Sequence, residues 1–230
     1  MKCQCLTLIS PTTRFYFPFH ILGLFLTIFT FFYVIEDGGR STLSLRMPPT
    51  VEDTSWWQFL SVSLVHLDAY HMYNNLILLG LTGSIFELIH GPVPSIAVFW
   101  IGGTTGALIE AAWWNGLKGT RLMGASAGGY ALVSAHLAHL CLNWKETAFR
   151  FSFLAAILFY VTITIIFAFI SSEYTVAHTA HWVGFVQGLL VGFVTVKNVR
   201  VFRWENTISL VSFFFATAIL VSGCMKCGLN

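Results

Sequence analysis

Long runs without a charged residue constrain this chain more than any other feature of its sequence. Charged residues make up only 10% of the 230 positions and hydrophobic residues 56%, whereas soluble domains carry roughly 25% charged residues. So few charges cannot cover the surface of a soluble fold of this size. The net charge of +2 also gives no basic surface for a nucleic acid. The composition therefore excludes a cytosolic domain, a disordered chain and a nucleic-acid binder, and it predicts an all-α protein that crosses the lipid bilayer several times.

Seven segments are apolar and long enough to be membrane-spanning helices, which need about 20 residues each. We expect them at residues 17–36, 68–88, 95–114, 122–142, 151–171, 176–196 and 207–224. The apolar stretch from Trp56 to Ile89 is too long for one crossing, so we interpret Trp56–Val65 as a membrane-dipping or interfacial segment. With a cytosolic N-terminus, seven Lys and Arg residues face the cytosol and five face the other side. This bias favours that orientation.

The five cysteines indicate little chemistry. Their odd number and scattered spacing do not describe a disulfide framework. Cys224 and Cys227 form one CxxC without a second pair, which is too little for a structural zinc site. We interpret them as unmodified thiols.

Polar side chains converge at one level of the predicted bundle. Ser126 lies in the first turns of the fourth span and His181 in the first turns of the sixth. His71 and Asn75, four residues apart, share one face of the second span. Even-numbered helices enter the membrane from the same side, so these side chains lie at similar depth, roughly 5–10 Å in at 1.5 Å rise per residue. This inference holds for either orientation of the protein.

Small residues predict that the fourth and sixth spans pack closely. Gly184 and Gly188 lie four residues apart in the sixth span, and the fourth contains Gly128 with neighbouring alanines. Such spacing lets two helix backbones approach each other. A hydrogen bond between Ser126 and His181 requires this approach.

A serine beside a histidine is the minimum set for nucleophilic catalysis. The hydroxyl becomes a nucleophile when a neutral imidazole accepts its proton. We therefore predict Ser126 as the nucleophile and His181 as the general base. No acidic residue is predicted near His181 in the membrane, so the sequence indicates a dyad rather than a triad. Tyr130, one turn after Ser126, is placed to pack on the imidazole and fix its orientation.

The oxyanion of a tetrahedral intermediate requires hydrogen-bond donors. We expect them from the side chains of His71 and Asn75 and from the backbone N–H of Ser126, since the first amides of a helix are unpaired. Gly124 is expected to let a substrate backbone approach closely.

At these residues the sequence resembles the rhomboid family of intramembrane serine proteases, over about residues 51–200. Three motifs carry the resemblance. Gly124-Ala125-Ser126-Ala127-Gly128-Gly129-Tyr130 matches the family's serine motif, His66, His71 and Asn75 match its His-x4-His-x3-Asn, and Ala180-His181 with Gly184 and Gly188 match its Ala-His-x-x-Gly-x-x-x-Gly.

The resemblance implies a rhomboid-like six-helix bundle plus one C-terminal transmembrane helix. It divides the chain into a short N-terminal tail (1–16), a protease core (17–200) and a C-terminal loop with the seventh helix (201–230). The implied activity is that of a serine endopeptidase that cuts another protein's transmembrane helix near its outer end, in a membrane of the secretory pathway, without a cofactor or metal. The implied site consists of Ser126 and His181, the oxyanion hole of His71, Asn75 and the Ser126 amide, and the supporting residues His66, Gly124, Tyr130, Gly184 and Gly188.

Two residues depart from the family pattern. Ala127 replaces the glycine after the serine, which we expect to crowd the oxyanion region slightly. Gln58 replaces an arginine that braces the first loop.

Two other functions stay open. One is a catalytically inactive rhomboid-like protein that binds transmembrane clients for trafficking or degradation. The other is a metal transporter that uses His66, His71, His178 and His181, although it leaves the serine motif unexplained. We interpret His136 and His139, toward the far end of the fourth span, as structural.

Overall fold

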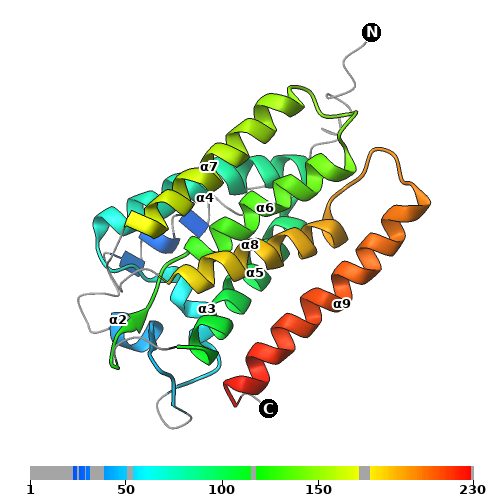
Figure 1. Ribbon diagram of the computed structural model, residues 1–230. Coiled ribbons are helices and arrows are strands. Elements are labelled where there is room, and N and C mark those ends of the chain that lie inside the picture. Colours follow the sequence, from blue (N-terminus) through cyan, green and yellow to red (C-terminus); the bar gives the residue numbers. More distant parts are fainter. Residues whose placement is uncertain are drawn as a thin grey trace.

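A computed structural model describes residues 39–50, 54–114, 118–170 and 177–228, together with positions 23, 24, 26–28, 30 and 31. Most of this part of the chain is helical. The long helices are α4 (Ala69–His90), α5 (Pro92–Ala112), α6 (Ser126–Leu142), α7 (Arg150–Ile170), α8 (His178–Thr195) and α9 (Arg203–Lys226) (Figure 1). The short elements are α2 (Gly39–Leu43), α3 (Gln58–Ser61), the 3-10 helix η3 (Val62–Leu64), and the antiparallel strands β1 (Leu45–Arg46) and β2 (Arg121–Leu122).

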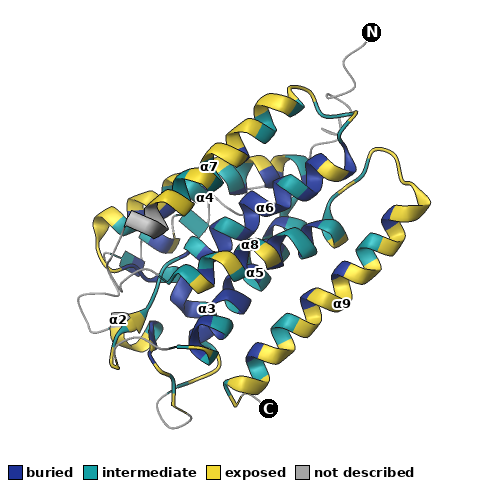
Figure 2. Ribbon diagram, viewed as in Figure 1, coloured by how far each residue is buried: buried dark blue, intermediate teal, exposed yellow. Residues whose placement is uncertain are grey.

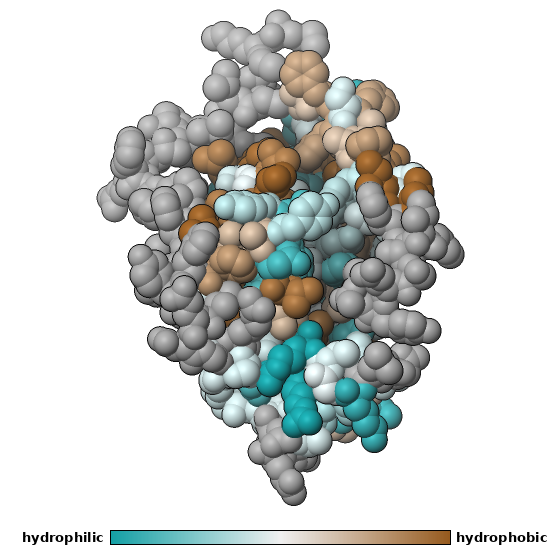
Figure 3. Space-filling view, turned by 90° about the vertical axis from the view of Figure 1, so that its left-hand side faces the viewer, coloured by the Kyte–Doolittle hydropathy of each residue, from teal (hydrophilic) through white to brown (hydrophobic). Residues whose placement is uncertain are grey.

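The long helices confirm the predicted all-α membrane fold. By length and composition, α4, α5 and α9 can each cross a membrane, and α7 is apolar from Arg150 to Ile166. On the face shown in Figure 3, hydrophobic side chains dominate the upper part and hydrophilic ones gather at the lower end. Most of the predicted first span, 17–36, lies outside the described residues.

Three helices begin three or more residues away from the start that the hydropathy pattern predicts, and one of them is α9, which begins at Arg203 rather than residue 207. Helix α5 begins at Pro92 rather than residue 95, because a proline is tolerated in the first turn and Gly91, with φ of +91°, makes the break before it. Helix α6 begins at Ser126 rather than residue 122, because Arg121 and Leu122 pair with β1. Ser126 is therefore the first residue of its helix.

Helices α5, α6 and α8 form the centre of the bundle, while much of α7 and α9 is exposed on its outside (Figure 2). Glycines bring the central helices together. A Cβ at Gly184 or Gly188 of α8 would overlap the backbone of α6 at Ala127 or Ala131. The predicted close packing of the fourth and sixth spans is present, and it leaves no room for larger residues at these glycines.

The first loop packs on the C-terminal end of α5. Leu45, Phe59 and Val62 form an apolar cluster with Leu108 and Ala111. Segment 56–65, predicted to dip into the membrane or lie at its surface, is short helical structure in this loop.

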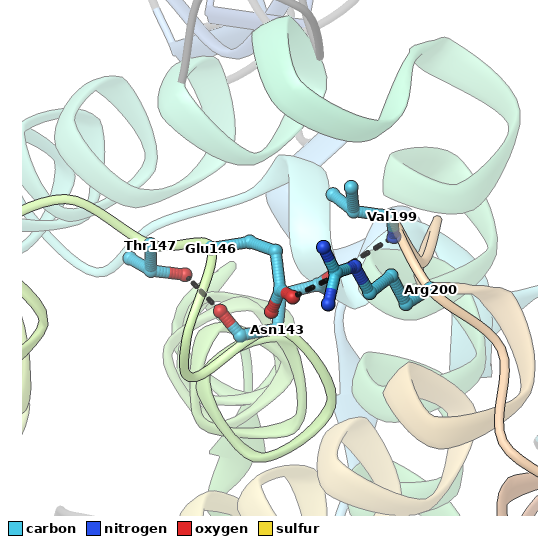
Figure 4. A network of polar contacts seen from close by, with 5 residues as sticks. All are labelled: Asn143, Glu146, Thr147, Val199 and Arg200. Atoms are coloured by element: carbon cyan, nitrogen blue, oxygen red, sulfur yellow. Dashed lines mark hydrogen bonds and ion pairs between the residues drawn. The ribbon is translucent and has the colours of Figure 1, made fainter. Parts of the chain in front are cut away.

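The opposite end of the bundle is closed by a polar network (Figure 4). Asn143, which is fully buried at the end of α6, accepts a hydrogen bond from the backbone N–H of Val199 (2.9 Å) and donates one to the carbonyl of Lys197 (3.2 Å). The backbone carbonyl of Asn143 accepts a hydrogen bond from the Thr147 hydroxyl (2.8 Å). The side chain of Asn143 thereby ties the end of α6 to the loop between α8 and α9.

We predict that Asn143→Ala lowers the free energy of unfolding by about 1–3 kcal/mol, because it removes two part-buried hydrogen bonds between the Asn143 side chain and the backbone of Lys197 and Val199. Thermal unfolding in detergent micelles measures the change. The control is Thr217→Ala on the exposed face of α9, whose hydroxyl bonds only within its own helix. An equal effect of the two substitutions would contradict the role assigned to the network.

Candidate active site

Ser126 and His181 lie within hydrogen-bonding distance. The Ser126 Oγ and His181 Nε2 are 2.7 Å apart. Ser126 opens α6, and His181 lies in the first turn of α8. Both side chains thus lie at the N-terminal ends of their helices. This agrees with the common depth predicted from the order of the spans.

The turn before Ser126 is held by residues far away in the chain. The Gly124 N–H donates to the carbonyl of Val62 (2.8 Å), and Met47 N–H donates to the carbonyl of Thr120 (2.9 Å). Gly124 has φ of +121°, which favours glycine. The first loop therefore fixes the direction from which the chain enters α6.

His71 lies against this turn. A Cβ at Gly124 would come within 2.8 Å of the His71 Cε1 and 2.9 Å of its Nε2. Gly124 thus accommodates the His71 ring. The expected approach of a substrate backbone to Gly124 stays a prediction. Asp68 caps α4 by accepting the His71 N–H (2.7 Å), which fixes the start of this helix.

Asn75 is 4% exposed, and its side-chain amide donates to the carbonyl of His71 (2.9 Å). One of its two N–H bonds is therefore used within α4. His66 is fully buried, 5.2 Å from the His71 ring between centroids, and its Nε2 lies 3.5 Å from the Ala125 N. His71 and Asn75 line the site on the α4 side, and His66 packs against the His71 ring.

The Tyr130 ring stacks on the His181 ring. Their centroids are 4.5 Å apart and their planes differ by 5°. Tyr130 in turn makes an edge contact with Tyr160 of α7, at 5.6 Å. The imidazole is therefore held flat between its serine neighbour and an aromatic face, as expected from the spacing of Ser126 and Tyr130.

Three further histidines of the described residues make contacts of their own. The His178 ring centroid is 6.5 Å from that of His181. His136 contacts the Thr82 carbonyl (2.9 Å) and His139 the Thr147 hydroxyl (3.2 Å), toward the other end of α6. Within the part of the chain that the structure describes, no three His, Cys, Asp or Glu side chains are grouped as metal ligands.

An acidic residue lies near His181, which the sequence analysis missed. Glu110, in the last turn of α5, is 8% exposed, and its Oε2 accepts the backbone N–H of Ala180 (2.8 Å). The statement that no carboxylate approaches His181 in the membrane is wrong, because α5 runs opposite to α6 and α8 and therefore ends where they begin. A glutamate inside an apolar span was the available signal.

Gln58 braces the first loop in place of the family's arginine. Its side-chain N–H groups donate to the carbonyls of Thr42 (2.8 Å) and Ser44 (3.2 Å), and its Oε1 accepts the Ser55 N–H (2.9 Å). Gln58 thus makes three hydrogen bonds within the first loop, where the family pattern has an arginine. The other departure, Ala127, lies on the side of α6 that packs against Gly184.

A cavity of about 1230 Å³ is lined by Ser126 and His181 together with residues of α4 and α7. Its polar end is lined by Ser126, His181, His71, Asn75 and Tyr130. Away from this end it continues between α4 and α7 along an apolar lining of Leu78, Leu81, Ile85, Phe153 and Ile157. The cavity therefore joins the Ser126–His181 pair to an apolar groove.

The Rhomboid domain family model matches residues 53–198. The chain belongs to the rhomboid family. The match confirms the resemblance expected over residues 51–200 and the rhomboid-like all-α bundle. Helix α9, a candidate membrane-spanning helix, follows the matched residues. The glycine contacts between α6 and α8 are thus part of a rhomboid core in this chain.

Named relatives agree with this assignment. Rhomboid-related protein 1 of Caenorhabditis elegans is 32% identical, over 83% of this chain and 60% of its own length. Rhomboid-related protein 3 of Homo sapiens is 28% identical, over 62% of this chain and 37% of its own. Rhomboid-like protease 1 of Toxoplasma gondii is 21% identical, over 66% and 52%. The chain therefore spans 60% or less of the length of these relatives.

We predict that Gly124→Ala lowers the free energy of unfolding by about 1–3 kcal/mol, because the backbone angle is unfavourable for alanine and the added methyl meets the His71 ring. Chemical unfolding in mixed micelles measures this. In the control, Gly80→Ala, the methyl group meets no atom within 4 Å, so stability should be unchanged or raised. If Gly124→Ala behaved like the control, the geometry of the turn would be wrong.

Proposed function

We propose that this rhomboid is an intramembrane serine endopeptidase, which hydrolyses a peptide bond in or near the transmembrane helix of another membrane protein. The observation that carries the proposal is the 2.7 Å contact between Ser126 Oγ and His181 Nε2 inside the cavity. A serine hydroxyl alone is a weak nucleophile, and a neighbouring imidazole that takes its proton activates it.

In the proposed mechanism, His181 Nε2 accepts the Ser126 proton while Oγ attacks the substrate carbonyl carbon. The imidazolium then gives this proton to the leaving amine, and a water molecule hydrolyses the acyl-enzyme by the same route in reverse. Tyr130 holds the ring in the plane that both transfers need, since it stacks at 4.5 Å.

The oxyanion hole in this proposal consists of the His71 side chain, the Asn75 side chain and the Ser126 backbone N–H. The His71 ring lies beside Gly124, two residues before the nucleophile. Asn75 keeps one N–H on the His71 carbonyl and has a second to donate. The Ser126 amide is in the first turn of α6, where no carbonyl of the helix can pair with it.

The cavity supports a transmembrane helix as the substrate. Its apolar part lies between α4 and α7, and on α4 Leu81 and Ile85 are exposed. A substrate helix reaching the polar end from this side keeps its side chains in an apolar environment until the scissile bond arrives at Ser126. The name of one relative, rhomboid-like protease 1, agrees with proteolysis.

We also propose an orientation with the N-terminus in the cytosol, in a membrane of the secretory pathway. Basic residues support it, because the loops at the end away from Ser126 carry Lys145, Arg150, Lys197 and Arg200. The site then faces the lumenal or outer side. The catalytic core is residues 17–200, preceded by the tail at 1–16 and followed by the C-terminal part at 201–230.

We predict that Ser126→Ala and His181→Ala each lower the rate of cleavage at least about 10³-fold. The assay follows a tagged single-span protein with helix-breaking residues near its outer end, in proteoliposomes. The control is Ser134→Ala, a buried serine of the same helix that bonds only to the Ala131 carbonyl, and it should retain most of the activity.

Cleavage by wild type and Ser126→Ala at the same rate would refute the serine mechanism. Folded wild type that binds such proteins without cutting any of them would favour an inactive, client-binding rhomboid. Loss of cleavage with a chelator, but not with Ser126→Ala, would favour a metal-dependent function.

We predict that Tyr130→Ala lowers kcat by about 10- to 100-fold, because the imidazole loses the surface that orients it. Tyr130→Phe keeps the ring and should keep most of the activity. Initial rates in the same assay measure both variants. Equal activities of the two variants would show that stacking does not matter.

A further inference from the structure

The carboxyl group of Glu110 lies near the site, and the proposed mechanism gives it no role. Burying a carboxylate costs free energy unless it is paired or hydrogen-bonded. Glu110 lies in a membrane-spanning helix and is 8% exposed. Ionisable residues at such positions commonly serve function.

Glu110 binds the first turn of α8. This helix begins at His178, so the N–H of Ala180 has no carbonyl of its own helix to bond. The Glu110 Oε2 accepts that N–H at 2.8 Å. The first bond within the helix follows one residue later, from His181 N–H to the Ala177 carbonyl (3.2 Å). A carboxylate is also the favourable charge at a helix N-terminus.

Gly106 lies one turn before Glu110 in α5, and it packs against the carbonyl side of Ala180. A Cβ at Gly106 would come within 2.6 Å of the Ala180 carbonyl oxygen and 3.1 Å of the Ala127 Cβ. Helix α5 therefore touches the residue before His181 at both its N–H and its carbonyl. It also touches the residue after Ser126.

We propose that Glu110 is a positioning residue, which sets the depth and rotation of the first turn of α8 so that His181 Nε2 meets Ser126 Oγ. This inference rests on the proposed proteolysis. Glu110 acts through the Ala180 N–H and does not touch the reacting atoms. The geometry supports this role because α5 contacts Ala180, which precedes His181, and Ala127, which follows Ser126. Small displacements of a catalytic group lower the reaction rate strongly.

The test compares Glu110→Leu, which lacks an acceptor, with Glu110→Gln, which keeps a carbonyl oxygen for the Ala180 N–H. In proteoliposomes with the tagged single-span protein, E110L should lower kcat by about 10- to 100-fold with little change in KM. E110Q should restore most of kcat. Amide exchange over residues 178–181 should become faster on the order of tenfold in E110L but not in E110Q.

The matched control is Gln187→Leu, which removes another buried hydrogen bond of α8, from Gln187 Nε2 to the Ala216 carbonyl of α9 (2.9 Å). It should leave kcat close to that of wild type. Unchanged kcat in E110L, or equal losses in E110L and E110Q, would overturn the inference while leaving proteolysis intact. Inactive but folded wild type would instead refute the proposed function. If E110L does not fold, Glu110→Ala replaces it against E110Q in the same comparison.

Discussion

Close contact between the backbones of α5, α6 and α8 is the constraint on which the rest of this structure depends. Gly184 and Gly188 let α8 lie against α6, and Gly106 lets α5 lie against both. Membrane helices gain no hydrophobic driving force from one another, so such packing supplies much of their association. It also brings the first residue of α6 within 2.7 Å of the first turn of α8. The Ser126–His181 contact is thus a consequence of how the helices pack.

Different contacts hold the two ends of α6. At one end, the first loop, held by Gln58 and packed on α5, directs the chain into α6. At the other end, Asn143 ties α6 to the loop after α8. Hydrogen bonds thus hold α6 at both ends, and the cavity between α4 and α7 reaches the residue at which α6 begins.

Much of this arrangement could be predicted from the sequence, since hydropathy and turn residues locate the helices from α4 to α9. Because even-numbered spans enter the membrane from the same side, the sequence correctly places Ser126, His181 and His71 close to one another. The same argument considered only where helices begin and so overlooked Glu110, where α5 ends. The start of α6 at Ser126 depends on contacts with Met47 and Val62, more than sixty residues earlier. Local patterns do not contain such long-range contacts.

Covalent labelling tests the central claim, an activated serine at the start of α6, most directly. A fluorophosphonate probe reacts with serines that a neighbouring base activates. The folded protein in micelles would be labelled and the modified residue mapped by peptide mass spectrometry. The account predicts that the label is on Ser126 and is lost in His181→Ala. A folded protein that takes up no label, or takes it up on another serine, would contradict it.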